Sequence, residues 1–230
     1  MNKNLVMLYT KFPQIGNSKT RIAKESSERF AFGVSFCTLQ DTINKLNNSS
    51  SYDLLAVVNT KEEAQLFRRK LNLNAYVLDK SLLQKNQSKR FTFLFSHFKQ
   101  TYEKVILIPS DVPSIKQSIL IEAFRKLGKY RYVFGPEYNG GVYLIGMNDK
   151  PTNIFDIVRW STEYSVKDLV SNSEGNSYLL KFKGDLNKLN DLKLFKEDIK
   201  RRSPLLYEFL SKNKFYKEAE MGDKIAYAYH

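Results

Sequence analysis

The chain has 230 residues, a formal net charge of +13 and a single cysteine, Cys37. One cysteine excludes an intramolecular disulfide and a CxxC zinc site, and two histidines, His97 and His230, are too few to complete a structural zinc site. A chain of this length buries roughly 70% of its unfolded surface, so it can fold without such cross-links. Any metal is therefore expected to be Mg²⁺ or Mn²⁺, held by oxygen ligands.

The positive charge is spread along the whole chain, and no block of five or six like charges appears. Aromatic residues do not alternate with arginine in a pattern that reads RNA. We therefore expect a solvated basic surface without a nucleic-acid partner, and a charge that favours anionic substrates such as nucleotides. The apolar run Leu5–Tyr9 is too short for a signal peptide, and no run reaches the length of a membrane span. The expectation is a cytoplasmic protein.

The hydrophobic pattern predicts strands that alternate with helices over the first 135 residues. In chain order, the expected strands are Leu5–Thr10, Leu54–Val58, Ala75–Leu78, Val105–Ile108, Tyr132–Phe134, Val142–Gly146 and Ser177–Phe182, and the expected helices are Thr20–Leu46, Lys61–Leu71, Ser88–Tyr102, Ser114–Leu127, Thr162–Ser171, Asp191–Arg201 and Pro204–Leu210. This order predicts an α/β fold with a parallel sheet and helices on both faces. No linker divides the chain, so we expect one domain over residues 1–212 and a C-terminal tail over 213–230.

The loop between the first strand and the first helix is a candidate phosphate-binding segment. It contains Gly16 and carries three cations, Lys11, Lys19 and Arg21, at the start of a predicted helix, where free N–H groups also favour anions. It is not a Walker loop, because Ser18 stands where that motif needs a glycine before the lysine. A solvated basic loop is an equally good interpretation of this segment alone.

Ser110 and Asp111 follow the clearest strand in the sequence. Open α/β sheets bind ligands beyond the carboxyl ends of their strands, so Asp111 is placed to hold a divalent metal against a diphosphate. For Asp111 taken alone, a turn or helix cap is the simpler explanation, since Ser114 could begin a helix there.

Three further segments contain candidate site residues. Gly140 and Gly141 permit a positive φ or a close backbone approach before a strand, although a hairpin turn would use them too. Trp160 could stack on a ring or lie in the core, and Ser161 or Thr162 could cap a helix. The oxygen-rich stretch that begins at Asp185 could complete a metal site or cap a helix.

Taken in order, these segments resemble the bacterial glycosyltransferase-like proteins of the nucleotide-diphospho-sugar transferase superfamily, whose fold is called GT-A. The chain is also similar to the 2-phospho-L-lactate guanylyltransferases and the molybdenum-cofactor nucleotidyltransferases. The matching stretches are Lys11-Phe12-Pro13 through Gly16, Lys19-Thr20-Arg21-Ile22, Pro109-Ser110-Asp111-Val112-Pro113, Gly135-Pro136, Asn139-Gly140-Gly141-Val142-Tyr143-Leu144-Ile145-Gly146, Trp160-Ser161-Thr162 and Asp185 through Leu192. The resemblance implies a mixed, mostly parallel sheet.

The resemblance also implies roles for individual residues. Lys19 and Arg21 would meet the nucleotide phosphates, Asp111 would bind the divalent metal, and Asn187 or Asp185 would supply a second ligand. The remaining candidates for the substrate site are Ser110, Asn139, Trp160, Ser161 and Thr162. Asn139 and Asn187 stand where the family has aspartates, and of the family's Gln-Gly-Asp-Leu-Gly stretch only Arg90 is found. The general base stays open among Asp156, Glu163 and Glu137.

Three functions are therefore weighed. The first is a metal-dependent transferase that moves a sugar from a nucleotide sugar, or a nucleotidyl group from an NTP, to a small-molecule acceptor. The second is a catalytically impaired nucleotide-binding protein on the same fold. The third, a basic nucleic-acid-binding protein, predicts an affinity that falls steeply with salt.

Overall fold

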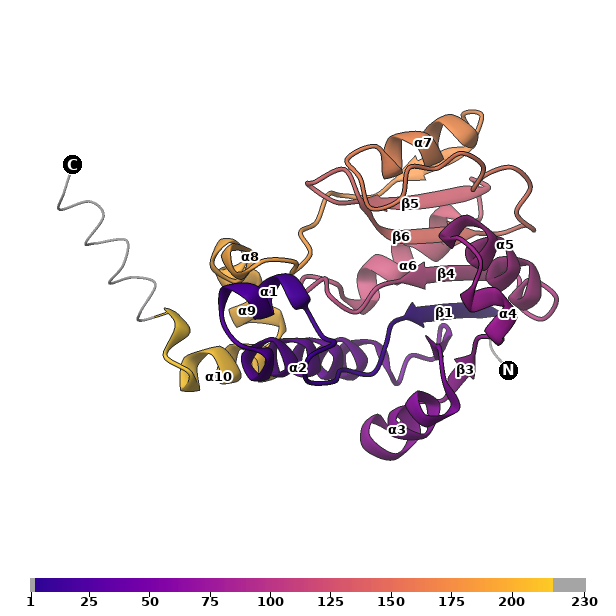
Figure 1. The fold of residues 1–230 in the computed structure, drawn as a ribbon. Coiled ribbons are helices and arrows are strands. Elements are labelled where there is room, and N and C mark those ends of the chain that lie inside the picture. Colours follow the sequence, from indigo (N-terminus) through magenta and orange to yellow (C-terminus); the bar gives the residue numbers. More distant parts are fainter. Residues whose placement is uncertain (1–2, 217–230) are drawn as a thin grey trace, which may run out of the picture. The chain divides into compact units, whose positions relative to one another are not determined.

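A computed structural model of the chain describes residues 3–216, in which seven strands form one sheet. The order is β3-β2-β1-β4-β6-β5-β7, and Figure 1 shows β1, β4, β6 and β5 side by side in it. β6 runs antiparallel to β4 and β5, whereas the other neighbours are parallel. The sheet is therefore mixed and mostly parallel, as the resemblance implied. The strands are β1 (Asn4–Tyr9), β2 (Asp53–Val58), β3 (Ala75–Val77), β4 (Lys104–Ile108), β5 (Tyr132–Pro136), β6 (Val142–Met147) and β7 (Ser177–Leu179).

The described residues divide into two compact units. The sheet unit contains residues 3–12, Lys45–Ser110 and Ile115–Gly184, and the helical unit contains Pro13–Asn44, Asp111–Ser114 and residues 185–216. The tail predicted over 213–230 lies outside the described residues from position 217 onward. The single domain expected over residues 1–212 stays a prediction.

Helices cover the sheet inside its own unit. On one face, strand residues such as Leu5 and Met7 form a core with Phe91 and Phe95 of α5 and with Leu169 of α7. The alternate strand residues are buried on the other face, where Leu127 and Ile106 pack around Gly146 of β6. Because the strands are apolar on both sides, they show the continuous runs from which a buried parallel sheet was expected. The helices of this unit are α3 (Lys61–Leu71), α4 (Lys80–Leu83), α5 (Gln87–Phe98), α6 (Gln117–Lys126) and α7 (Ser165–Asn172).

The helical unit has a core of its own. Ile22, Ala31 and Val34 pack there with buried leucines of the C-terminal helices. The carboxylate of Asp41, which is 1% exposed, accepts hydrogen bonds from the backbone N–H groups of Leu205 and Leu206, at 3.2 Å and 2.9 Å. This carboxylate, on a side chain from α2, therefore caps α10 (Pro204–Lys212). The helices are α1 (Thr20–Glu25), most of α2 (Glu28–Leu46), α8 (Leu189–Leu194), α9 (Lys196–Arg202) and α10 (Pro204–Lys212).

Several predicted helix boundaries are wrong for local reasons. The helix expected over Thr20–Leu46 is broken between α1 and α2, because Ser26 Oγ donates to the carbonyl of Ile22 while Ser27 Oγ accepts from the N–H of Phe30. Serine side chains that bond the backbone in this way compete with a continuous helix. The helix expected over Asp191–Arg201 is likewise split into α8 and α9 at Phe195.

Two capping predictions also fail. Ser114 does not begin a helix, because α6 starts at Gln117 with Lys116 as its N-cap. Thr162 does not cap α7, which starts at Ser165. Instead, Thr162 Oγ1 accepts from the N–H of Tyr164 and donates to a carbonyl oxygen three residues earlier, so it closes a turn before the helix.

Candidate functional site

Lys19 and Asp111 form an ion pair inside the helical unit. Lys19 Nζ lies 2.8 Å from Asp111 Oδ2, and the same ammonium donates to the backbone carbonyl of Leu186. The two charged side chains are only 13% and 26% exposed. Because partial burial weakens the screening of charges by solvent, this pair interacts more strongly than a surface pair.

The backbone brings these residues together. The N–H of Leu186 donates to the carbonyl of Asp111 at 3.0 Å, so the segment after β4 lies against the segment that begins at Asp185. Lys19 is the N-cap of α1 and has a left-handed backbone with a φ of 45°. Its carbonyl accepts from the N–H of Ala23 at 2.9 Å, which fixes the point from which its side chain leaves the helix.

Asp185 and Asn187 complete the cluster. Asn187 Nδ2 donates to Asp185 Oδ2, so Oδ1 is the atom of Asn187 that could coordinate a metal. Burial raises the pKa of Asp185, the negative charge of Asp111 raises it further, and the ammonium of Lys19 opposes both effects. Asp191 does not join them, because its carboxylate caps α8 by accepting from the N–H groups of Asn187 and Lys188 at 2.7 Å and 2.6 Å.

This set of donors fits a hard divalent cation. Two carboxylates, a side-chain amide oxygen and the main-chain oxygen of Leu186 are the oxygen ligands that Mg²⁺ and Mn²⁺ prefer. Within residues 3–216, no group of three or more His, Cys, Asp or Glu side chains gathers as a metal site. A cation here would therefore use Asp111 and Asp185 together with neutral oxygen atoms.

The rest of the phosphate-loop candidate is more exposed. Ser18 Oγ accepts from the N–H of Gln14 and donates to its carbonyl, both at 2.8 Å, which closes the loop before Lys19. Gly16 has a φ of 84°, and the carboxylate of Glu28 is the nearest group to the place of its missing Cβ, at 3.6 Å. Arg21 is exposed in α1, which has only six residues. A phosphate at this loop would therefore be held by cationic side chains rather than by the dipole of so short a helix.

Other candidates belong to the sheet unit, at the edge where its parallel strands end. Ser110 Oγ is hydrogen bonded to Thr10 Oγ1 at 2.9 Å, which links the ends of β4 and β1, and Lys11 is exposed just beyond Thr10.

The buried carboxylate of Glu63 accepts from the N–H groups of Phe12 and Asn59, at 3.0 Å and 2.9 Å. Glu63 was not among the predicted site residues, although Thr60 three positions earlier completes a recognisable helix-capping pattern.

The two glycines of the Asn139-Gly140-Gly141 loop are required by its geometry. Gly140 has a φ of 84°, and a Cβ there would lie 2.1 Å from the backbone oxygen of Glu163. A Cβ on Gly141 would lie 2.2 Å from a carboxylate oxygen of Glu137. Asn139 Oδ1 accepts from the N–H of Gly141 at 2.8 Å, so the amide makes a hydrogen bond that an aspartate would also make. Of the general-base candidates, Glu137 is buried, whereas Glu163 and Asp156 are exposed.

Trp160 packs against the aromatic core of the sheet unit. Its ring meets Phe91 edge to face at 5.2 Å, and its Nε1 donates to Ser88 Oγ at 2.8 Å. Ser161 is exposed and has a φ of 61°. Arg90, the residue that was matched to the family's Gln-Gly-Asp-Leu-Gly stretch, also lies in this unit. It donates to the hydroxyl of Tyr9 at 3.1 Å.

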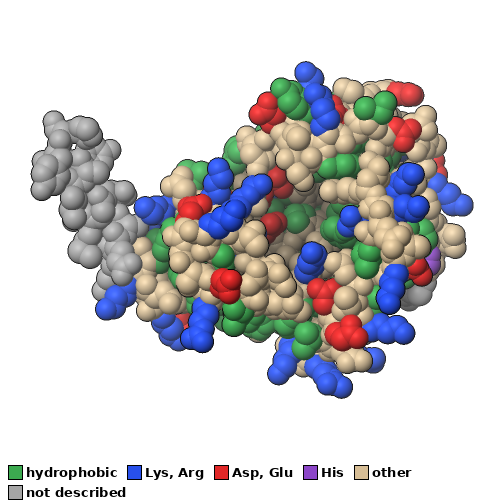
Figure 2. Space-filling model, viewed as in Figure 1, with side chains coloured by type: hydrophobic (Ala, Val, Ile, Leu, Met, Phe, Trp, Pro, Cys, Tyr) green, Lys and Arg blue, Asp and Glu red, His purple; other side chains and the backbone are tan. Residues whose placement is uncertain are grey.

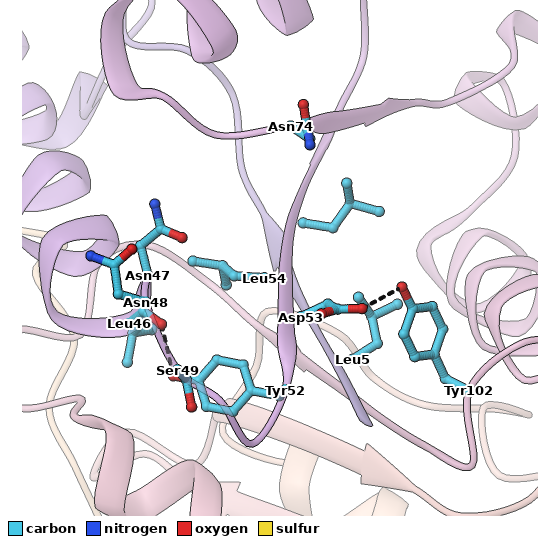
Figure 3. Close-up of a pocket in the computed structure, with 11 residues that line it drawn as sticks. Leu5, Leu46, Asn47, Asn48, Ser49, Tyr52, Asp53, Leu54, Asn74 and Tyr102 are labelled. Carbon is cyan, nitrogen blue, oxygen red and sulfur yellow. Dashed lines mark hydrogen bonds between the residues drawn. The ribbon is translucent and has the colours of Figure 1, made fainter. Parts of the chain in front are cut away.

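A hollow of about 430 Å³ lies at the opposite edge of the sheet, where β1 and β2 begin (Figure 3). Asp53 accepts a hydrogen bond there from the hydroxyl of Tyr102 at 3.0 Å. Among the described residues that line the hollow, none is Lys or Arg, and Asp53 is the one charged side chain. This hollow therefore does not match the predicted phosphate site.

Figure 2 shows lysine and arginine side chains scattered over the visible face, with acidic side chains between them. This agrees with the spread of charge along the sequence. Within residues 3–216, no helix combines the length and the apolar character that a membrane crossing requires.

The fold matches several solved structures. The chain has a TM-score of 0.81 and 22% identity with a proposed nucleotide-diphospho-sugar transferase from Desulfovibrio desulfuricans G20, with 93% of this chain and 96% of that chain covered. A cytidylyltransferase from Leptospira borgpetersenii serovar Hardjo-bovis gives 0.58 and 12%, over 93% and 95%. Rv0371C from Mycobacterium tuberculosis H37Rv, solved with manganese, gives 0.51 and 11%, over 85% and 98%. At these identities the likeness shows the fold, which is that of the nucleotide-diphospho-sugar transferases.

No curated protein gives a significant sequence match. A family model described as an uncharacterized protein conserved in bacteria (DUF2064) matches residues 42–162, which is more than half of the chain. The match includes Asp111, Gly140, Gly141 and Trp160, and thus spans three of the segments on which the resemblance rests. The chain therefore belongs to the DUF2064 family.

Proposed function

We propose that the chain is a metal-dependent transferase that uses a nucleotide-activated donor, and we favour transfer of a sugar from a nucleotide-diphospho-sugar to a small acceptor. The observation that carries the proposal is the cluster of Lys19, Asp111, Asp185 and Asn187 in the helical unit. A diphosphate leaving group is stabilised by positive charge. The lysine offers a cation to its oxygen atoms, and the paired carboxylates offer ligands to a metal that would neutralise it further.

Each residue then has a definite role. Lys19 and Arg21 bind the phosphate oxygens of the donor. Asp111 holds the divalent ion, with Asp185 and the side-chain oxygen of Asn187 as further ligands. When bound, the metal neutralises negative charge that develops on the departing diphosphate. The manganese named with the structurally similar Rv0371C supports a divalent metal.

Nucleotidyl transfer from an NTP is the second candidate, because one structural neighbour is a cytidylyltransferase. The two reactions release different products. Glycosyl transfer releases a nucleoside diphosphate, whereas nucleotidyl transfer releases pyrophosphate. An assay of the released phosphate species over a panel of small acceptors therefore distinguishes them. Release of neither product, with nucleotide binding retained, would favour the impaired nucleotide-binding protein.

The proposed site is tested by calorimetric titration with UDP-glucose, GDP-mannose and CTP, with and without Mn²⁺. We expect a ligand from this panel to bind more tightly with the metal present. Asp111→Ala should reduce that metal-dependent affinity by at least about ten-fold, because a bound divalent cation would lose its main carboxylate.

Asp198→Ala is the matched control, since Asp198 is an ion-paired aspartate of the same unit that faces solvent beside Arg202. It should leave binding unchanged. Metal-dependent binding that survives in Asp111→Ala would show that the metal site is elsewhere. Tight binding without any effect of Mn²⁺ would instead favour a nucleotide-binding protein that does not use a metal.

A further inference from the structure

The ammonium of Lys19 lies among the oxygen atoms to which the proposed function assigns a metal. It contacts Asp111 Oδ2 at 2.8 Å and the carbonyl oxygen of Leu186. Asp185 interacts electrostatically with both Lys19 and Asp111. A divalent cation on Asp111 would therefore stand beside an ammonium in a partly buried site, where like charges repel strongly.

We propose that Lys19 and the divalent metal are alternative cations for this cluster, and that the diphosphate of the donor draws Lys19 away from Asp111, so that nucleotide and metal bind cooperatively. The inference rests on the proposed function, because it takes the donor's phosphates as the anion that receives the ammonium.

Such an exchange requires only the side chain of Lys19 to turn away from Asp111. The Lys19 carbonyl is fixed by its hydrogen bond from the N–H of Ala23, whereas the ammonium ends a flexible four-carbon chain. In the structure, the ammonium neutralises the charge of Asp111 and is itself satisfied by the oxygen of Leu186. With nucleotide, phosphate oxygens offer the ammonium new acceptors, and the carboxylates become available to the metal. Because coupling between two binding equilibria is reciprocal, each ligand must then strengthen the other.

The arrangement also predicts a selectivity. A divalent ion alone must displace Lys19 from Asp111 without compensation, whereas an ion that arrives with a diphosphate meets a cluster from which Lys19 has been withdrawn. The site should therefore discriminate against free metal and favour the metal–nucleotide complex.

The test measures binding of Mn²⁺ by the electron paramagnetic resonance signal of the free ion, in the full chain without nucleotide. Lys19→Met should bind Mn²⁺ about ten-fold more tightly than the wild type, because the competing cation is gone. Lys24→Met is the matched control: Lys24 is an exposed lysine in the last turn of the same helix, and its loss should leave Mn²⁺ affinity unchanged. Lys19→Gln, which retains a donor toward Leu186, provides a second uncharged variant if Lys19→Met folds poorly.

A second set of titrations uses UDP and GDP, corrected for Mn²⁺ complexes formed in protein-free buffer. Wild-type affinity for the better nucleotide should rise about ten-fold with Mn²⁺. Lys19→Met should bind that nucleotide more weakly, and its affinity should depend less on the metal. The double variant Lys19→Met, Asp111→Ala should lose the tightened Mn²⁺ binding, which would place that binding at this cluster.

Unchanged or weaker Mn²⁺ binding in both uncharged Lys19 variants would overturn the exchange, whatever the nucleotides do. Failure of every protein to bind UDP or GDP, together with tighter Mn²⁺ binding in Lys19→Met, would retain the competition but overturn the cooperativity and the proposed function on which it rests. The two failures are therefore distinguishable.

Discussion

The carboxylate of Glu63 links the loop after β1 to the loop after β2 through two backbone hydrogen bonds. It accepts from the N–H groups of Phe12 and Asn59 while only 7% of the residue is exposed. Glu63→Gln keeps the shape but replaces one acceptor with a donor, so one partly buried N–H loses its partner. We expect the free energy of unfolding in urea to fall by about 1–3 kcal/mol.

Glu62→Gln is the matched control for this change, because it removes the same charge one residue earlier at an exposed position. It should shift the urea midpoint little. Equal midpoints for the two variants would mean that the backbone hydrogen bonds of Glu63 contribute no net stability.

The candidate site was predictable residue by residue but not as an arrangement. Motif order in the sequence singled out Lys19 and Asp111, yet it could not show that their side chains meet, because 92 residues separate them. The carbonyl of Leu186 also escaped prediction, since main-chain atoms have no motif of their own. The cap formed by Asp191 agrees with the alternative that the stretch from Asp185 caps a helix.

At the scale of elements, the geometry of the glycine loop before β6 predicts how much stability is lost when Gly140 is substituted. Gly140→Ala must accept both a positive φ and a Cβ that would lie 2.1 Å from the oxygen of Glu163. Gly175 has a similar φ of 81° but nothing within 4 Å of its Cβ position, so Gly175→Ala isolates the conformational cost, which is about 1–2 kcal/mol.

We expect Gly140→Ala to lower the free energy of unfolding in urea by about 1–3 kcal/mol more than Gly175→Ala, because a backbone oxygen cannot move aside as a flexible side chain does. Equal losses in the two variants would show that the loop relaxes at no cost, and that close approach to Glu163 does not explain Gly140.

Elements whose signal is their own hydrophobic pattern were predicted best. The helix Lys61–Leu71 is confirmed at both ends, and the strands of the sheet begin within a residue of their expected positions. Errors lie where a side chain bonds the backbone, as at Ser26 and Thr162, or where a predicted cap is not used, as at Ser114. Periodicity records which face is buried, and it does not record such local competition.

At the scale of the whole molecule, the parallel strands direct the site residues of the sheet unit to one edge. Thr10 and Ser110 meet there, and the loop with Gly140 and Gly141 follows β5. The fold class followed from the alternation of strands and helices, because that order admits few sheet topologies. The resemblance implied a mixed sheet, but nothing in the sequence identified β6 as its antiparallel strand, since a buried strand has the same pattern in either direction.

The net charge of +13 could serve either a nucleotide site or a nucleic-acid-binding surface, and the salt dependence of affinity distinguishes the two. A protein that binds duplex DNA through six to ten phosphate contacts loses about 10³–10⁵ in affinity between about 50 mM and about 200 mM salt. A site in which Lys19 and Arg21 meet one diphosphate involves few cations. Affinity for UDP or GDP, whichever binds, should therefore fall by less than about ten-fold over the same range. A duplex of about 20 base pairs should bind more weakly than the nucleotide even at the lower salt concentration, because the basic residues are spread along the sequence and are scattered over the face seen in Figure 2. Fluorescence anisotropy with labelled nucleotide and labelled duplex measures both affinities. Tighter binding of the duplex, with a steep salt dependence, would show that the basic surface binds nucleic acid. It would contradict the proposed transferase site.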